Sequence, residues 1–279
     1  MRADSRSDRR ILIVGIDGLR LDQARIPGVA PVLSRLLGQG RLSHMTMELP
    51  TMSGPGWSTL LTGTRIAEHG VTGNSFIGHR LHSHPDVLSR AFHRDTSART
   101  FAAAGWPPLV SPAGLGPVIH ERREQQRAGL HHVFARDGET FGYTTVDAEI
   151  AAVSCAHLTQ HHVDLGFVYF CGADEAGHLH GAMSEEYREA ISRVDAHLGG
   201  LIAVIEERAD AGEDWLVLTL TDHGHRPEGG HGGDSAEERA SFLLAWSPEQ
   251  SFLPAWPEQI QPWEVMDLVL EHRHPPHRQ

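Results

Sequence analysis

Three segments of the sequence combine carboxylates with neighbouring histidines or glycines in a spacing that suits metal binding. Asp17 precedes a glycine, Asp174 is followed four residues later by His178, and Asp222 is directly followed by His223. Carboxylate oxygens and imidazole nitrogens together are ligands for Zn²⁺, Mn²⁺ and similar ions. The adjacent Asp-His pair is the most specific of the three, since an isolated Asp-Gly is usually only a turn.

A third histidine lies in the Gly-Gly-His-Gly-Gly stretch at 229–233, where glycines let the backbone approach a metal or a phosphate closely. His231 is our choice for the last ligand, with His225 as the second choice. The segments together supply enough ligands for two ions. Two ions about 4 Å apart can bind the attacking and leaving oxygens of a phosphoryl group together.

A nucleophile for such a site is expected in the segment 49–63, where Thr51 and Ser53 precede an expected helix over 53–61. A helix N-terminus favours an anion. Ser53 could equally serve as the N-cap of that helix. Coordination to a metal would activate either hydroxyl, so these residues alone leave the choice open. Asn74, in a Gly-Asn pair, could donate its amide to a developing phosphoryl oxygen.

The elements that must position these side chains are buried strands. Continuous apolar runs at 11–16, 165–171 and 215–220 predict strands covered on both faces. Asp17, Asp174 and Asp222 each come just beyond the carboxyl end of one of them. In an open parallel sheet those ends share one edge, where ligands bind, so we expect the three acids to meet there.

Helices are expected at 32–37, 53–61, 146–161, 184–208 and 263–272, and a fourth strand at 241–246. Alternating strands and helices predict an α/β fold with a mainly parallel central sheet and helices on both faces. We expect one catalytic domain over 1–279. The range 75–142, rich in Gly, Pro, His and Arg, is predicted to be a less regular insertion on the substrate side.

The amino-acid composition limits the classes of binding partner and the cellular location that we expect. The formal net charge is −12, with 36 acidic and 24 basic residues, which argues against nucleic acid and anionic membranes as partners. Every basic residue is arginine. The two cysteines make no disulfide framework, and the apolar run at 11–16 is too short for a signal or a membrane span, so we expect a cytoplasmic protein.

The order of motifs resembles the alkaline phosphatase superfamily, and within it the type I phosphodiesterase/nucleotide pyrophosphatase family. The motifs are Asp-Gly, Pro-Thr-x-Ser-x-Pro, Thr-Gly, His-Gly-x-x-x-Asn, Asp-x-x-Gly-His, Asp-His-Gly and Gly-Gly-His-Gly. They cover 11–74 and 165–247 well and the middle of the chain poorly. Sulfatases on a related fold have Arg where this chain has Trp57, which argues against that activity.

The resemblance assigns roles to these positions. The family nucleophile is the second hydroxyl of its motif, which selects Ser53 over Thr51, and a phosphate-contacting asparagine matches Asn74. The resemblance implies that one metal is held by Asp17, Ser53, Asp222 and His223, and the other by Asp174, His178 and His231. Zinc is the first choice, with manganese or magnesium as alternatives.

The implied activity is metal-dependent hydrolysis of a small-molecule phosphodiester or nucleotide-type pyrophosphate through a phosphoseryl intermediate. A phosphomonoesterase and a phosphonate hydrolase of the same superfamily are the alternatives. Monoesterases tend to add a cation for the second phosphate charge, which Arg65, Arg80 or the arginines between 90 and 127 could supply. The non-enzymatic alternative is an inactive metal-binding homologue.

Overall fold

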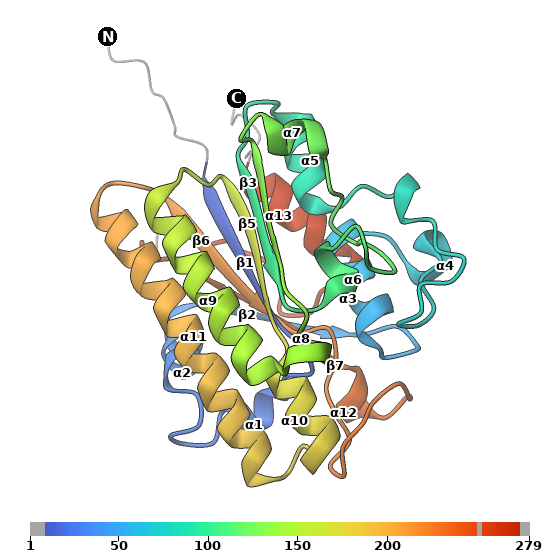
Figure 1. Cartoon of the computed structure of the whole chain (residues 1–279). Helices are drawn as coiled ribbons and strands as arrows, with labels where there is room; N and C mark the ends of the chain where they lie inside the picture. Colours follow the sequence, from blue (N-terminus) through green and yellow to red (C-terminus); the bar gives the residue numbers. More distant parts are fainter. Residues whose placement is uncertain (1–8, 250–252, 274–279) are drawn as a thin grey trace.

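A computed structural model describes residues 9–249 and 253–273, and a seven-stranded sheet runs through its centre (Figure 1). The strand order is β2-β7-β6-β1-β5-β3-β4. The described pairs β2–β7 and β7–β6 are antiparallel, and all the others are parallel. The strands are β1 (Arg10–Ile16), β2 (Arg41–Thr46), β3 (Thr100–Ala104), β4 (His131–Ala135), β5 (Leu165–Phe170), β6 (Trp215–Leu220) and β7 (Ala240–Trp246).

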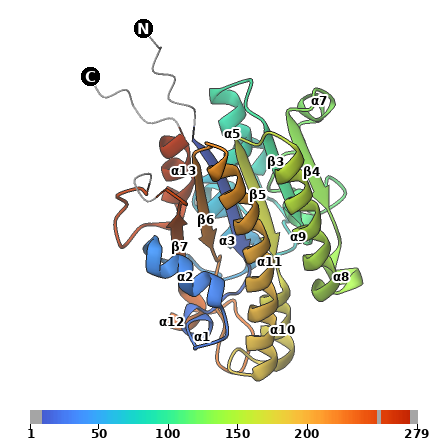
Figure 2. The same ribbon diagram turned by 90° about the vertical axis from the view of Figure 1, so that its left-hand side faces the viewer.

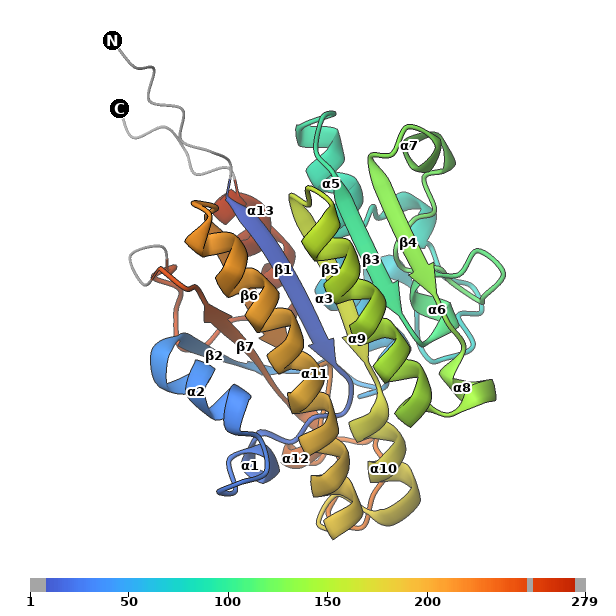
Figure 3. The same cartoon turned by 60° about the vertical axis from the view of Figure 1, so that its left-hand side comes forward.

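Helices cover both faces of this sheet, which confirms the predicted fold class. One face carries α2 (Pro31–Gln39), α9 (Tyr143–Gln160), α10 (Gly172–His180) and α11 (Glu185–Asp210), and Figures 2 and 3 show α9 and α11 lying along it. The other face carries α3 (Ser53–Thr62), α5 (Val87–Arg94), α6 (Pro107–Val110) and α13 (Val265–Arg273). Of the described helices, none is long and apolar enough to span a bilayer.

Short helical turns fill the connections. They are α1 (Leu21–Ala24), α4 (Ile66–His69), α7 (Arg123–Arg127), α8 (Gly138–Phe141), α12 (Ala236–Arg239) and the 3₁₀ turns η1 (Leu81–Ser83) and η3 (Pro262–Glu264). The strongest predicted elements match the observed ones closely, because buried strands and long amphipathic helices have a clear apolar pattern. The sequence analysis did not predict β2.

The range 75–142 contributes more regular structure than we expected. It supplies β3 and β4, which pair in parallel with each other and extend the sheet beyond β5. Their sequences, Thr-Phe-Ala-Ala-Ala and His-His-Val-Phe-Ala, contain few branched apolar residues, so their strand pattern is weak. Pairing of β3 with β5, and of β4 with β3, compensates for that low propensity.

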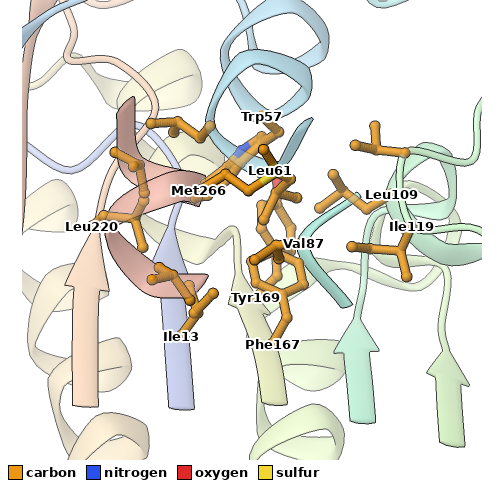
Figure 4. Packing of buried hydrophobic residues seen from close by; sticks show 14 of the residues in the cluster. Ile13, Trp57, Leu61, Val87, Leu109, Ile119, Phe167, Tyr169, Leu220 and Met266 are labelled. Atoms are coloured by element: carbon orange, nitrogen blue, oxygen red, sulfur yellow. The ribbon is translucent and has the colours of Figure 1, made fainter. Parts of the chain in front are cut away.

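The core on the α3 side leads directly to the strand ends. The Trp57 ring, from α3, is fully buried and meets Tyr169 of β5 edge to face, with ring centroids 5.5 Å apart. Figure 4 shows Trp57 together with Tyr169, Phe167 and Met266 in this layer. Gly15 of β1 makes the room, because a Cβ there would lie 2.4 Å from Cη2 of Trp57.

Gly15→Ala should therefore destabilise the protein by about 1–3 kcal/mol, the usual cost of overpacking a filled core. The measurement is the free energy of unfolding in urea. Gly38→Ala is the matched control, since a Cβ at this exposed helical position meets nothing within 4 Å. Equal effects of the two substitutions would contradict this account of the packing.

Candidate active site

The three predicted acids do meet at the carboxyl edge of the sheet. Asp17 follows β1, Asp222 follows β6, and Asp174 lies in the first turn of α10, which follows β5. All three side chains are buried. They form two groups of closely spaced potential ligand atoms, each within 4.8 Å of one another. The groups are Asp17, Asp222 and His223, and Asp174, His223, His225 and His231.

Ser53 lies inside the first group. Its Oγ is 3.3 Å from Asp17 Oδ1 and 3.3 Å from His223 Nε2. It is the first residue of α3, and Met52 rather than Ser53 occupies the N-cap position, so capping does not engage this hydroxyl. The side chain is 6% exposed, which leaves it reachable at the edge of the cluster.

Thr51, the other hydroxyl that the sequence offered, points elsewhere. Its Oγ1 donates to the Gly233 carbonyl and accepts from the Gly232 N–H, and its own carbonyl accepts from His231 Nδ1. Thr51 therefore ties the glycine-rich 229–233 segment to the segment that carries Ser53. The 229–233 segment can bend toward Thr51 because Gly229, Gly230 and Gly232 have φ of 99°, 76° and 118°, which glycine adopts without strain.

His178 and His231 approach each other from separate segments, with their Nε2 atoms 2.9 Å apart. His178 Nε2 is also 3.5 Å from Asp174 Oδ2. The structure thus brings the predicted ligands Asp174, His178 and His231 together. It also places His225 in the same cluster, with Nε2 2.8 Å from Asp174 Oδ1.

Asn74 is next to the nucleophile segment. Its Oδ1 accepts from the Gly54 N–H at 2.8 Å. The amide oxygen is therefore engaged, which leaves the Nδ2 group as the donor that a phosphoryl oxygen could accept from. The same bond occupies one of the N-terminal N–H groups of α3.

The electrostatics of the cluster favour cations. Burial and the neighbouring Asp174 charge raise the pKa of Asp17 to about 8, and burial with both neighbouring carboxylates raises the pKa of Asp222 well above its usual value. For Asp174 burial acts in the same direction. The hydrogen bond from His225 and the nearby histidines outweigh it and lower its pKa. Burial lowers the pKa of His223 and His231, which keeps both imidazoles neutral, the form that binds metals.

One buried atom is left without a partner in a way that fits a metal. Among the described residues, nothing hydrogen-bonds to Asp222 Oδ2, although a buried carboxylate oxygen normally has a donor. Its Oδ1 faces the Gly18 N–H, and Oδ2 is 3.3 Å from His223 Nε2. The donor set of oxygens and imidazole nitrogens therefore suits a divalent first-row ion.

Two residues that the sequence analysis did not assign to the site hold Asp17. The Tyr169 hydroxyl and the Trp57 indole N–H both donate to Asp17 Oδ2, at 2.6 and 2.8 Å. Oδ1 is thereby left facing Ser53 and His223. The sequence feature that could have assigned Tyr169 to the site is its hydroxyl within an otherwise apolar strand, because a buried tyrosine hydroxyl needs a hydrogen-bond partner.

The comparisons with known proteins agree with this architecture. The chain belongs to the type I phosphodiesterase/nucleotide pyrophosphatase family, whose model matches residues 11–238. Among solved structures it is similar to murine ectonucleotide pyrophosphatase/phosphodiesterase 5, with a TM-score of 0.69 and 18% identity over 97% of both chains. A likeness at that identity shows the fold.

Curated relatives are longer proteins. The chain is 26% identical to the catalytic subunit of mouse GPI ethanolamine phosphate transferase 3, over 93% of this chain and 23% of that one. It is also 26% identical to human ectonucleotide pyrophosphatase/phosphodiesterase family member 7, over 83% of this chain and 51% of the relative. The chain thus spans about half of one relative and a quarter of the other.

Tyr169→Phe should weaken the binding of one divalent ion about 10- to 100-fold, since it removes a hydrogen bond that orients Asp17. The measurement is Zn²⁺ affinity by competition with a chelator. Tyr143→Phe is the control, because the Tyr143 hydroxyl is hydrogen-bonded to the Cys171 thiol, whereas the described donors to Asp17 Oδ2 are Tyr169 and Trp57. An unchanged affinity in Tyr169→Phe would show that this hydroxyl does not orient a ligand.

Proposed function

We propose that the protein hydrolyses a small-molecule phosphodiester or nucleotide-type pyrophosphate at this site through a phosphoseryl intermediate on Ser53. The observation that supports this most is the position of the Ser53 hydroxyl, 3.3 Å from both a carboxylate and an imidazole of a buried ligand cluster. Membership of the phosphodiesterase/nucleotide pyrophosphatase family supports the same reaction class.

The proposal includes two divalent ions, with zinc as first choice. Asp17, Ser53, Asp222 and His223 would hold one, and Asp174, His178 and His231 the other. When bound, such ions lower the pKa of a coordinated hydroxyl and neutralise charge on phosphoryl oxygens.

The residues of the chain supply the rest of the reaction. Ser53 Oγ forms the bond to phosphorus in line with the leaving oxygen, whose bond to phosphorus breaks. Water then cleaves the Oγ–phosphorus bond and restores the serine. Asn74, whose Oδ1 accepts from the Gly54 N–H, has its Nδ2 group left to donate to a phosphoryl oxygen as charge develops.

A specific observation favours a diester over a monoester. Three of the predicted cationic candidates have partners of their own in the described structure. Arg65 pairs with Glu48, Arg80 donates to the carbonyls of 67 and 68, and Arg122 donates to Thr100 at the start of β3. The described ion pairs of the three site carboxylates are with histidines. None of the described ion pairs brings a guanidinium to these three carboxylates, which supports a substrate without the second negative charge of a monoester.

Substrate and location remain predictions. Small molecules suit a net charge of −12, which disfavours nucleic acid and anionic membranes. Cys155 and Cys171 are free thiols, as expected in a reducing cytoplasm.

Ser53→Ala should lower kcat for a phosphodiester by about 10³-fold or more, because no other hydroxyl takes its position. Ser58→Ala is the matched control. Ser58 lies in the same helix and is fully buried, and among the described residues its Oγ has no partner. Undiminished turnover in a folded, metal-replete Ser53→Ala protein would overturn the proposed mechanism.

The diester preference predicts that kcat/KM for bis-p-nitrophenyl phosphate exceeds that for p-nitrophenyl phosphate at least about tenfold. One missing charge-assisted contact accounts for about 1.5–3 kcal/mol of discrimination. Steady-state kinetics at one pH and metal concentration provide the comparison. The reverse order of the two substrates would make the protein a monoesterase.

A further inference from the structure

His225 is a fully buried histidine in the ligand cluster, the second choice for the last ligand from the sequence, and the mechanism above gives it no role. Its Nε2 lies 2.8 Å from Asp174 Oδ1, and its ring is packed against those of His178, His223 and His231, with centroids 5.1–5.8 Å apart. By distance alone it qualifies as a metal ligand. The hydrogen-bond partner of the other ring nitrogen, Nδ1, distinguishes histidines that could bind a metal through Nε2 from those that could not.

His223 and His231 share one arrangement. Nδ1 of His223 is 3.1 Å from the Gly224 carbonyl, and Nδ1 of His231 is 2.7 Å from the Thr51 carbonyl. A carbonyl only accepts, so each Nδ1 carries the proton. Each Nε2 is then unprotonated and faces the cluster. This is how metal-binding histidines are usually held, with the second ring nitrogen donating to an oxygen.

His225 has the opposite arrangement. Its Nδ1 is buried, and among the described residues nothing hydrogen-bonds to it, so no acceptor fixes a proton there. Its Nε2 faces a carboxylate oxygen, which accepts hydrogen bonds when ionised. A proton on Nε2 therefore has an acceptor, Asp174 Oδ1, whereas a proton on Nδ1 would have none among the described residues.

The backbone around His225 is shaped to keep this contact. A Cβ at Gly18 would lie 2.6 Å from His225 Nε2 and 2.6 Å from Asp174 Oδ1. A Cβ at Gly177 would lie 2.8 Å from the same ring. Two glycines from separate segments thus leave space for the ring and the carboxylate to meet directly. The His225 carbonyl is anchored as well, because Arg20 Nη1 donates to it at 2.9 Å.

We infer that His225 is a positioning residue whose Nε2–H holds Oδ1 of Asp174. The carboxylate thereby keeps its orientation toward His178, whose Nε2 is 3.5 Å from Oδ2, and His231, whose Nε2 is 3.5 Å from Oδ1, the two histidines that would bind the same ion. This inference rests on the proposed metal-dependent function. It also chooses His231 over His225 as the last ligand. Both readouts below concern protons and zinc rather than turnover, so they still apply if no phosphoester is hydrolysed.

The direct test is the tautomeric state of the histidines in the zinc-loaded, ¹⁵N-labelled wild-type protein, read from long-range ¹H–¹⁵N correlation spectra. We expect His225 to carry its proton on Nε2, and His223 and His231 to carry theirs on Nδ1. Signals are assigned by their loss in His225→Gln and His231→Gln. A His225 protonated on Nδ1 would make Nε2 a zinc ligand and overturn the inference.

Zinc binding by variants provides the second test, with Zn²⁺ alone as the probe. His225→Leu should weaken one of the two sites about 10- to 100-fold, whereas His225→Gln, whose amide N–H can replace the donor, should stay close to wild type. His231→Gln should lose one zinc per chain. Loss of one zinc from His225→Gln would identify His225 as a ligand. Unchanged affinity in folded His225→Leu would eliminate the positioning role.

Discussion

Asp17, Asp174 and Asp222 bring three carboxylates together in a site where all three side chains are almost completely buried. Neighbouring like charges repel strongly inside a protein. Removing each charge from water also costs several kcal/mol unless a partner compensates. The raised pKa values of Asp17 and Asp222 express that cost, since part of the charge is relieved by holding protons. Bound cations would offset the cost of burying these charges more completely than protons do.

Each of these carboxylates has one oxygen in contact with a buried donor, and for Asp17 and Asp222 the other oxygen is directed at the cluster. Tyr169 and Trp57 hold Oδ2 of Asp17, the Gly18 N–H faces Oδ1 of Asp222, and His225 is bonded to Oδ1 of Asp174. Fixed donors of this kind keep the remaining oxygens pointing inward despite their repulsion. The donors come from a strand, a helix and two loops, so the ligand geometry depends on the packing of the whole sheet edge.

The same residues therefore pack the hydrophobic core and position the side chains of the site. Trp57 fills the space above Gly15 on one side and donates to Asp17 on the other. The helix that carries Trp57 begins at Ser53, so the same packing that buries the indole sets the position of the proposed nucleophile. The Thr51 contacts then join this segment to His231 across the edge of the sheet.

The sequence by itself determined the α/β class, the three strongly apolar strands and the acid that follows each of them. Buried strands are recognised from their continuous apolar runs, and the carboxyl ends of parallel strands share one edge of the sheet. Motif order determined the family and selected Ser53 as the expected nucleophile. Only the tertiary structure decided that 75–142 supplies β3 and β4, since the pairing of β3 with β5 and of β4 with β3 outweighs weak local propensity. It alone showed the donors Tyr169, Trp57 and Thr51 and the different hydrogen-bond partners of His225 and His231, because a hydrogen bond between distant segments leaves no periodic trace in the chain.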